Sequence, residues 1–227
     1  MGELFTAGFW DYFGPLLLTG TRDTLVMTVV STVFAYLLGL PLGVLLVLTG
    51  DHGICPHQTL NRCVGWVINV GRSLPFIILM VCVMPFTKIL VGTKIGVLGA
   101  IPPLVISAAP FIARMVETSL SEVDAGVVEA AQSMGASTFQ IVWKVYLPEA
   151  LPSLILGGSI SIITILAYTA IAGAIGAGGL GDLAIRYGYQ RREPAKMWVA
   201  AVLLIVLVQV IQSVFSRVSN RIDKRLK

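Results

Sequence analysis

Long stretches without a charged side chain constrain this chain more than any other feature. One runs from Thr24 to Leu48, and another lies between Glu149 and Asp182. A helix that crosses the hydrocarbon core of a bilayer needs about 20 apolar residues, at about 1.5 Å rise each. Hydrophobic residues make up 56% of the 227 positions and charged residues only 12%. A soluble domain carries about twice that charged fraction, so the sequence predicts an all-α polytopic membrane protein.

The alternation of apolar runs and polar breaks predicts five spans within a transmembrane domain. Arg72 interrupts the second run and is expected at the membrane boundary, where its long side chain reaches the headgroups. Pro102, Pro103 and Pro110 lie in the third run and predict a kinked or broken helix. We place the domain at 24–217 and its spans at about 24–48, 64–86, 95–115, 152–175 and 197–216.

The segments outside the spans are aromatic or basic. Residues 1–23 are rich in aromatic side chains, which is typical of a helix at the membrane surface, and Arg22 and Asp23 close this segment. Residues 182–196 predict a polar loop, and residues 218–227 a basic cytoplasmic tail. The basic residues are scattered beside spans, so we expect lipids and no nucleic acid as partners. Their distribution favours an external N-terminus and a cytoplasmic C-terminus only slightly.

A polar loop at 50–63 holds both histidines and two of the three cysteines of the chain. Its four potential ligands match no standard zinc spacing, so we expect a polar loop without a metal. The third cysteine lies in the second span, and the three together indicate no disulfide framework. The four potential ligands are His52, Cys55, His57 and Cys63.

Small residues recur every four positions near the end of the fourth span. Such ladders allow helix backbones to approach closely, and close packing is the interpretation that we favour. The alternative is a flexible helix end that takes part in gating a pathway. The candidates for a pathway or a gate are Arg72, Pro75, Gly173, Gly176, Gly178 and Gly179.

The stretch from Asp124 to Pro152 is amphipathic and lies between spans. Asp124 is a plausible N-cap, Gly135 suits the left-handed residue that ends a helix, and Ser137 with Gln140 has capping-box spacing. We therefore expect two short helices joined by a glycine turn, with Pro148 ending the second. Their apolar faces, typical of a docking surface, are expected to contain Val127, Val128, Ala131, Met134, Phe139, Val142, Trp143 and Tyr146.

Motifs for nucleotide hydrolysis and for ion coupling are missing from the sequence. No glycine is directly followed by lysine, as a Walker A motif requires, and neither HExxH nor GxSxG occurs. The apolar runs carry no carboxylate relay, and there is no TVGYG-type filter. A chain of this kind that moves solute uphill must take its energy from another chain. The amphipathic stretch is the obvious place for that chain to bind.

The letters EAAQSMGAS, followed by VYLPEALP, resemble the EAA loop of bacterial ABC importer permeases. Val145 stands where the family pattern has isoleucine. The resemblance implies that residues 121–149 form a cytoplasmic loop, in which Glu129 to Gly135 is the coupling helix that docks in a groove of a separate ATPase. The residues that match the pattern are Glu129, Ala130, Ala131, Gly135, Leu147 and Pro148.

Three further blocks, RSLPFIILM, AAPFIARMVE and GAIGAGGLGDLAIRYGYQR, are similar to the methionine-importer permease subfamily. That similarity implies a non-enzymatic permease that forms a homodimer in the bacterial inner membrane and moves methionine by alternating access. It also implies a pair of cytosolic ATPases that bind ATP and Mg²⁺, an external methionine-binding lipoprotein, and no cofactor in this chain. Another amino acid or small solute as cargo stays open, as does a membrane scaffold that transports nothing.

Overall fold

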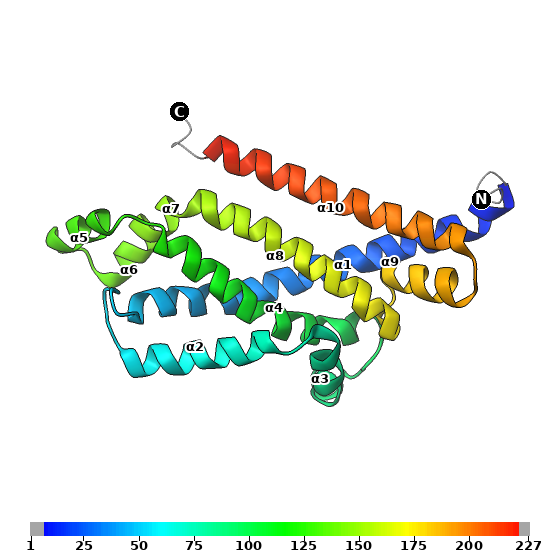
Figure 1. Ribbon diagram of the computed structural model, residues 1–227, viewed down its shortest axis with the longest axis horizontal. Helices are drawn as coiled ribbons and strands as arrows, with labels where there is room; N and C mark the ends of the chain where they lie inside the picture. The colour runs from blue at the N-terminus through cyan, green and yellow to red at the C-terminus, as the bar shows by residue number, and fades with distance from the viewer. Residues whose placement is uncertain (1–6, 223–227) are drawn as a thin grey trace. The chain divides into compact units, whose positions relative to one another are not determined.

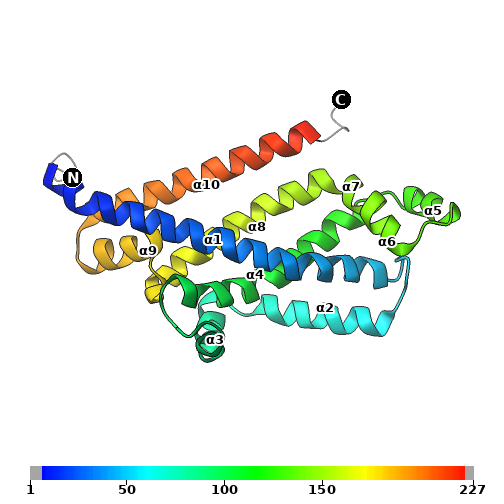
Figure 2. The ribbon, with the colours of Figure 1, turned by 180° about the vertical axis from the view of Figure 1, so that it is seen from behind.

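The computed structural model describes residues 7–222, which form helices joined by short turns (Figure 1, Figure 2). No β-strand occurs among these residues, so the predicted all-α class is confirmed. The label η marks a π-helical segment, in which the turns are wider than in an α-helix. The elements are α1 (Ala7–Thr49), α2 (Gln58–Ser73), α3 (Phe76–Val91), α4 (Gly96–Ser121), α5 (Ala125–Ser133), α6 (Thr138–Ile141), η2 (Val142–Tyr146), α7 (Leu147–Glu149), α8 (Leu151–Ala172), η3 (Gly173–Ala177), α9 (Gly179–Asp182), η4 (Leu183–Gln190) and α10 (Pro194–Ile222).

Four helical stretches within the described residues are long and apolar enough to cross a membrane, and α2 with α3 form a fifth, broken candidate. Counting that pair as one span gives the predicted five. The four continuous candidates are Gly8–Thr49, Gly96–Ser121, Leu151–Ala177 and Pro194–Ile222.

The chain divides into two compact units, and four long helices contribute to both. The first unit combines the start of α1 with α3 and with the segment around α9. The second unit contains α2, α5, α6 and the end of α1. Their described residues are 7–33, 74–107 and 162–211 for the first unit, and 34–73, 108–161 and 212–222 for the second.

Two apolar clusters form the core of the first unit. In one, Phe13 and Leu180 are fully buried, and side chains of α1, α9, η4 and α10 pack around them. In the other, Phe76 of α3 stacks on Tyr168 of α8 with ring centroids 4.5 Å apart. The Oγ1 of Thr24 accepts a hydrogen bond from the backbone N–H of Leu180 at 2.9 Å, which fixes the start of α9 against α1.

In the second unit, two glycines on α1 make room for α4. A Cβ at Gly39 would clash with Ala109 and Ile112, and one at Gly43 with Val116. The two glycines are four residues apart, so they lie on one helix face and let the two backbones approach closely. The GxxxG spacing of this pair is visible in the sequence, although the sequence does not show that α4 is the helix it faces.

No helix break separates the predicted surface segment from the first span among the described residues, and the place of residues 7–23 at the membrane surface stays a prediction. Helix α1 passes through Arg22 and Asp23 without a break and continues to Thr49. Thr24 is 1% exposed and Phe13 is fully buried, so packing inside the first unit holds this part of α1 in one helix. The predicted segment before Ala7 lies outside the described residues.

The second and third spans also differ from expectation. The second is interrupted, because α2 ends at Ser73 and Pro75 has an extended backbone (φ −56°, ψ 134°) before α3 begins. Proline disfavours helical geometry in the residue that precedes it, which explains a break at Leu74. The third span was predicted to be kinked or broken, and it is not broken, since α4 is helical from Gly96 to Ser121.

Residues 182–196 are largely helical, so the predicted polar loop is wrong. Leu180 and Leu183 are buried in the first unit, and Tyr187 packs against the same cluster. Leu183 and Tyr187 supply an inner face for η4 that the high charge of the segment concealed. At the other end, α10 continues to Ile222, so the predicted tail starts as helix, and 223–227 lie outside the described residues.

Candidate functional site

The 121–149 segment begins with a capped helix, as predicted. Asp124 is the N-cap of α5, and its side chain accepts a hydrogen bond from the N–H of Gly126 at 2.7 Å. Val128 and Ala131 are buried, whereas Glu129 and Ala130 between them are exposed. One side of α5 therefore packs on the rest of the second unit, and the other side leaves Glu129 and Ala130 exposed.

Gly135 forms the predicted turn between α5 and α6, with a left-handed φ of 77°. The N–H of Ala136 bonds to the carbonyl of Ala131 at 3.1 Å, and the N–H of Gly135 to that of Gln132 at 2.9 Å. This pair of bonds is a Schellman motif, which satisfies the last carbonyls of a helix and favours glycine. No atom lies within 4 Å of a Cβ built at Gly135, so its role is conformational.

The capping box at the start of α6 is also confirmed. The Oγ of Ser137 accepts from the N–H of Gln140 at 3.4 Å, and the Gln140 Oε1 accepts from the N–H of Ser137 at 2.9 Å. These two reciprocal bonds place the N-cap of the second helix two residues after Gly135.

The second helix does not end at Pro148, contrary to the prediction. A π-helical segment, Val142–Tyr146, leads directly into α7, and the N–H of Leu147 bonds to the carbonyl of Val142. Proline lacks an N–H and its ring crowds the carbonyl four residues earlier. We attribute its tolerance here to the wider turn that precedes it.

The π-helical segment determines which residues anchor the helix. Ile141 is 1% exposed, Tyr146 7% and Ala150 3%, so the inner positions are five and then four residues apart. Burial raises the pKa of the Tyr146 phenol above its ordinary value. Ile141 was missed in the sequence, because a search at a period of 3.6 residues assigns the inner face to other positions.

The predicted apolar stripe is therefore divided between an inner and an outer face. Met134, Phe139 and Trp143 are 82%, 70% and 62% exposed. The rings of Phe139 and Trp143 lie 6.2 Å apart, and we call these two residues the exposed aromatic pair. Large apolar side chains that no part of the described chain covers are typical of an interaction surface.

Most residues of the EAA pattern lie on the surface of this segment. Glu129, Ala130, Gly135 and Pro148 are exposed, Leu147 is half-buried, and only Ala131 is buried. Such a set of residues is suited to contact with a partner chain. Among residues 7–222, no three His, Cys, Asp or Glu side chains come together as a metal site.

The histidines of the 50–63 loop and its Cys55 have different neighbours and do not form one cluster. The Nδ1 of His57 accepts from the N–H of Leu60 at 3.3 Å and so caps α2. The thiol of Cys55 lies 3.7 Å from the hydroxyl of Thr138, while His52 borders a cleft.

The pathway candidates do not all belong to one unit. Arg72 is in the second unit and exposed, whereas Pro75 and the four glycines are in the first. At the small-residue ladders the backbone does approach another backbone closely, but the partner is the next segment of the same chain: the end of α8 and η3 lie against α9. The backbone reverses at Gly176, Gly178 and Gly179, whose φ values are 99°, 83° and 81°. A Cβ at Gly173 would crowd the backbone of Asp182.

This reversal borders a cleft of about 370 Å³ that contains both signs of charge. The Asp182 carboxylate accepts a hydrogen bond from Arg186 at 2.5 Å, and this bond raises the pKa of the Arg186 guanidinium. Asp23 of α1 also lines the cleft. A gating role for these glycines stays a prediction.

Comparison with known proteins places the chain among transport components. The family model described as binding-protein-dependent transport system inner membrane component matches residues 35–227. A Vibrio cholerae protein named as a probable D-methionine transport system permease protein is 50% identical over 92% of this chain and 93% of its own length. The methionine import system permease protein of Bacillus subtilis is 47% identical over 80% of this chain and 82% of its own length.

Solved structures agree. The chain superimposes on a chain from an inward-facing MetNI methionine ABC transporter with a TM-score of 0.92 and 46% identity, covering 93% of this chain and 98% of the other. An amino acid ABC transporter crystallised with histidines shares the fold alone, at a TM-score of 0.75 and 20% identity. The chain belongs to the family of binding-protein-dependent transport system inner membrane components.

Proposed function

We propose that this chain is the permease subunit of an ABC importer that carries methionine across the inner membrane by alternating access. The observation that carries the proposal is the 121–149 segment, whose EAA pattern lies on the surface beside the exposed aromatic pair. Relatives named as methionine permeases, at 47–50% identity over most of their length, support the substrate.

The 121–149 segment would be the mechanical input of the transporter. The energy would come from a separate pair of cytosolic ATPases, which bind ATP and Mg²⁺ and take the short helices in a groove. Exposed Glu129 suits a basic partner residue, and the exposed aromatic pair supplies apolar area. The capped turns at Asp124 and Gly135 support the rigidity that a lever needs. ATP-driven closure of the ATPases would shift the permease between its two states.

Three further parts of the proposal concern assembly. Five spans are few for a complete pathway, which supports a homodimer around one pathway. A cytoplasmic 121–149 segment requires, with five spans, an external N-terminus and a cytoplasmic C-terminus. A lipid-anchored methionine-binding protein would then deliver the substrate from outside, where the helical 182–196 segment is exposed to it.

Uptake into proteoliposomes tests the proposal. Purified permease is reconstituted with its ATPase and binding protein, and the uptake of labelled methionine is measured with ATP and with a non-hydrolysable analogue. We expect ATP-dependent methionine accumulation that unlabelled alanine or histidine does not compete away. Accumulation of another amino acid without methionine would refute the substrate assignment. A complex that neither takes up solute nor alters ATP turnover would support the scaffold alternative.

A further inference from the structure

The loop between α1 and α2 has a defined hydrogen-bonded structure. The N–H of Cys55 bonds to the carbonyl of Leu48 at 2.9 Å, and that of His57 to the carbonyl of Thr49 at 3.0 Å. The last carbonyls of α1 are thereby satisfied by the loop. A Cβ at Gly53 would overlap the carbonyl oxygens at the end of α1, so the loop packs onto that helix end as closely as a backbone allows.

The same loop touches the 121–149 segment. The thiol of Cys55 lies 3.7 Å from the hydroxyl of Thr138, the first residue of α6. The loop also faces α5 across a cleft of about 440 Å³, which is lined by His52 and Ile54 from the loop and by Val128 and Glu129 from α5. The loop is thus the part of the α1–α2 connection that contacts α6 and borders the same cleft as α5.

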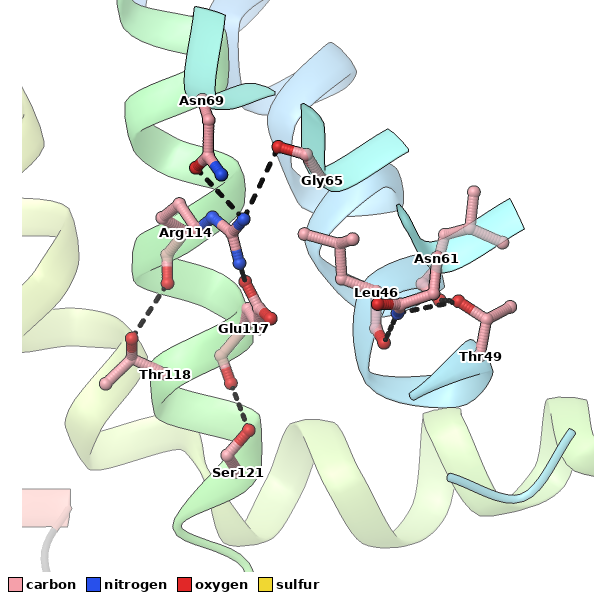
Figure 3. A network of polar contacts seen from close by, with 10 residues as sticks. Leu46, Thr49, Asn61, Gly65, Asn69, Arg114, Glu117, Thr118 and Ser121 are labelled. Atoms are coloured by element: carbon pink, nitrogen blue, oxygen red, sulfur yellow. Dashed lines mark hydrogen bonds and ion pairs between the residues drawn. The ribbon is translucent and has the colours of Figure 1, made fainter. Parts of the chain in front are cut away.

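Behind the loop, side chains tie α1, α2 and α4 into one hydrogen-bonded block (Figure 3). The Asn61 amide donates to the carbonyl of Leu46 at 2.7 Å and to Thr49 at 3.1 Å, which joins α2 to the end of α1. From α4, Arg114 donates to the Asn69 side chain of α2 at 3.1 Å and pairs with Glu117 at 2.6 Å. The loop is bonded to the end of α1, and through these side chains α1 is linked to α2 and α2 to α4.

We propose that residues 50–57 are a brace, which holds α6 against the block of α1, α2 and α4 and moves with it throughout the transport cycle. The inference rests on the proposed docking of the 121–149 segment to an ATPase. Covalently, the 121–149 segment is connected only to α4 and α8. The brace provides a second route, by which displacement of the short helices reaches α1 and α2 directly. Cys55 and Gly53 are positioning residues in this account.

A disulfide across the contact tests the brace. In a background with Cys63→Ser and Cys82→Ser, Thr138→Cys puts a second thiol in place of the hydroxyl that lies 3.7 Å from the Cys55 sulfur, and a disulfide requires the two sulfurs to approach to about 2.05 Å. The transporter is oxidised in its nucleotide-free state and, separately, after trapping with ATP and vanadate. We expect high disulfide yield in both states and no loss of methionine uptake after oxidation. Thr138→Cys combined with Cys55→Ala is the matched control.

Two results would overturn the brace. One is a disulfide that forms in only one nucleotide state. The other is uptake that oxidation abolishes and reduction restores in the pair but not in the control. Uptake that is absent even when the sample is reduced contradicts the proposed function instead, and the disulfide yields still decide whether the contact persists.

Hydrogen exchange provides a readout that does not depend on transport. Gly53→Val should speed exchange of the α6 amides without affecting α10, because it separates the loop from the end of α1. Gly14→Val is the matched control, since no atom lies within 4 Å of a Cβ at Gly14. Unchanged exchange in α6 of Gly53→Val would contradict the brace.

Discussion

Replacement of Trp143 by alanine should weaken binding of the ATPase without destabilising the permease. At 62% exposure, the side chain presents about 150 Å² to a partner. Covering that area completely would contribute about 4 kcal/mol at about 25 cal/mol per Å². Alanine keeps part of the contact and docking covers only part of the ring, so we expect a loss of about 2 kcal/mol, or about 30-fold in Kd.

The assay is a titration of permease in nanodiscs with labelled ATPase, followed by thermal unfolding of each variant alone. Trp66→Ala is the matched control, because Trp66 of α2 is 67% exposed but lies outside the 121–149 segment. We expect unchanged affinity for the control and unchanged unfolding temperature for Trp143→Ala. Equal weakening in both variants, or full affinity in Trp143→Ala, would refute the assignment of the exposed aromatic pair to the ATPase interface.

Three further changes test separate parts of the account. Ile141→Ala removes a fully buried anchor and should destabilise by about 2–4 kcal/mol, seen as a lower unfolding temperature; no shift would contradict the π-helical anchoring. Gly43→Leu should block the close approach of α1 to α4 and abolish folding, measured as loss of the monodisperse peak; a well-folded variant would contradict that packing. In a cysteine-free background, Gln190→Cys should react with an impermeant reagent from outside and Ser133→Cys should not; the reverse would overturn the proposed topology.

Local backbone chemistry made parts of the site predictable from the sequence. Asp124, Gly135 and the Ser137–Gln140 pair each act within a few residues of themselves, so their spacing alone predicts the caps and the turn. Most spans were predictable for a related reason, since backbone groups in hydrocarbon must be satisfied within the helix whatever the tertiary contacts; the second span, interrupted before α3, is the exception.

Features that depend on distant contacts were not predictable in this way. Ile141 and Tyr146 are five residues apart and share the inner face only because the helix widens between them. The chain reversal at Gly176 converts an apparent helix face into a close turn onto α9. The charged 182–196 segment is helical because Leu183 packs into an apolar cluster to which α1 contributes Phe13 and Leu17.

The coupling ratio, methionine taken up per ATP hydrolysed, tests the central claim most directly. Glu129→Lys reverses an exposed charge of the EAA pattern, and Glu122→Lys reverses an exposed charge just before α5 as its control. Our account predicts that Glu129→Lys still inserts, while uptake per ATP falls sharply, and that the control stays close to the original protein. An unchanged ratio in Glu129→Lys would contradict the claim that this segment transmits the energy of the ATPase.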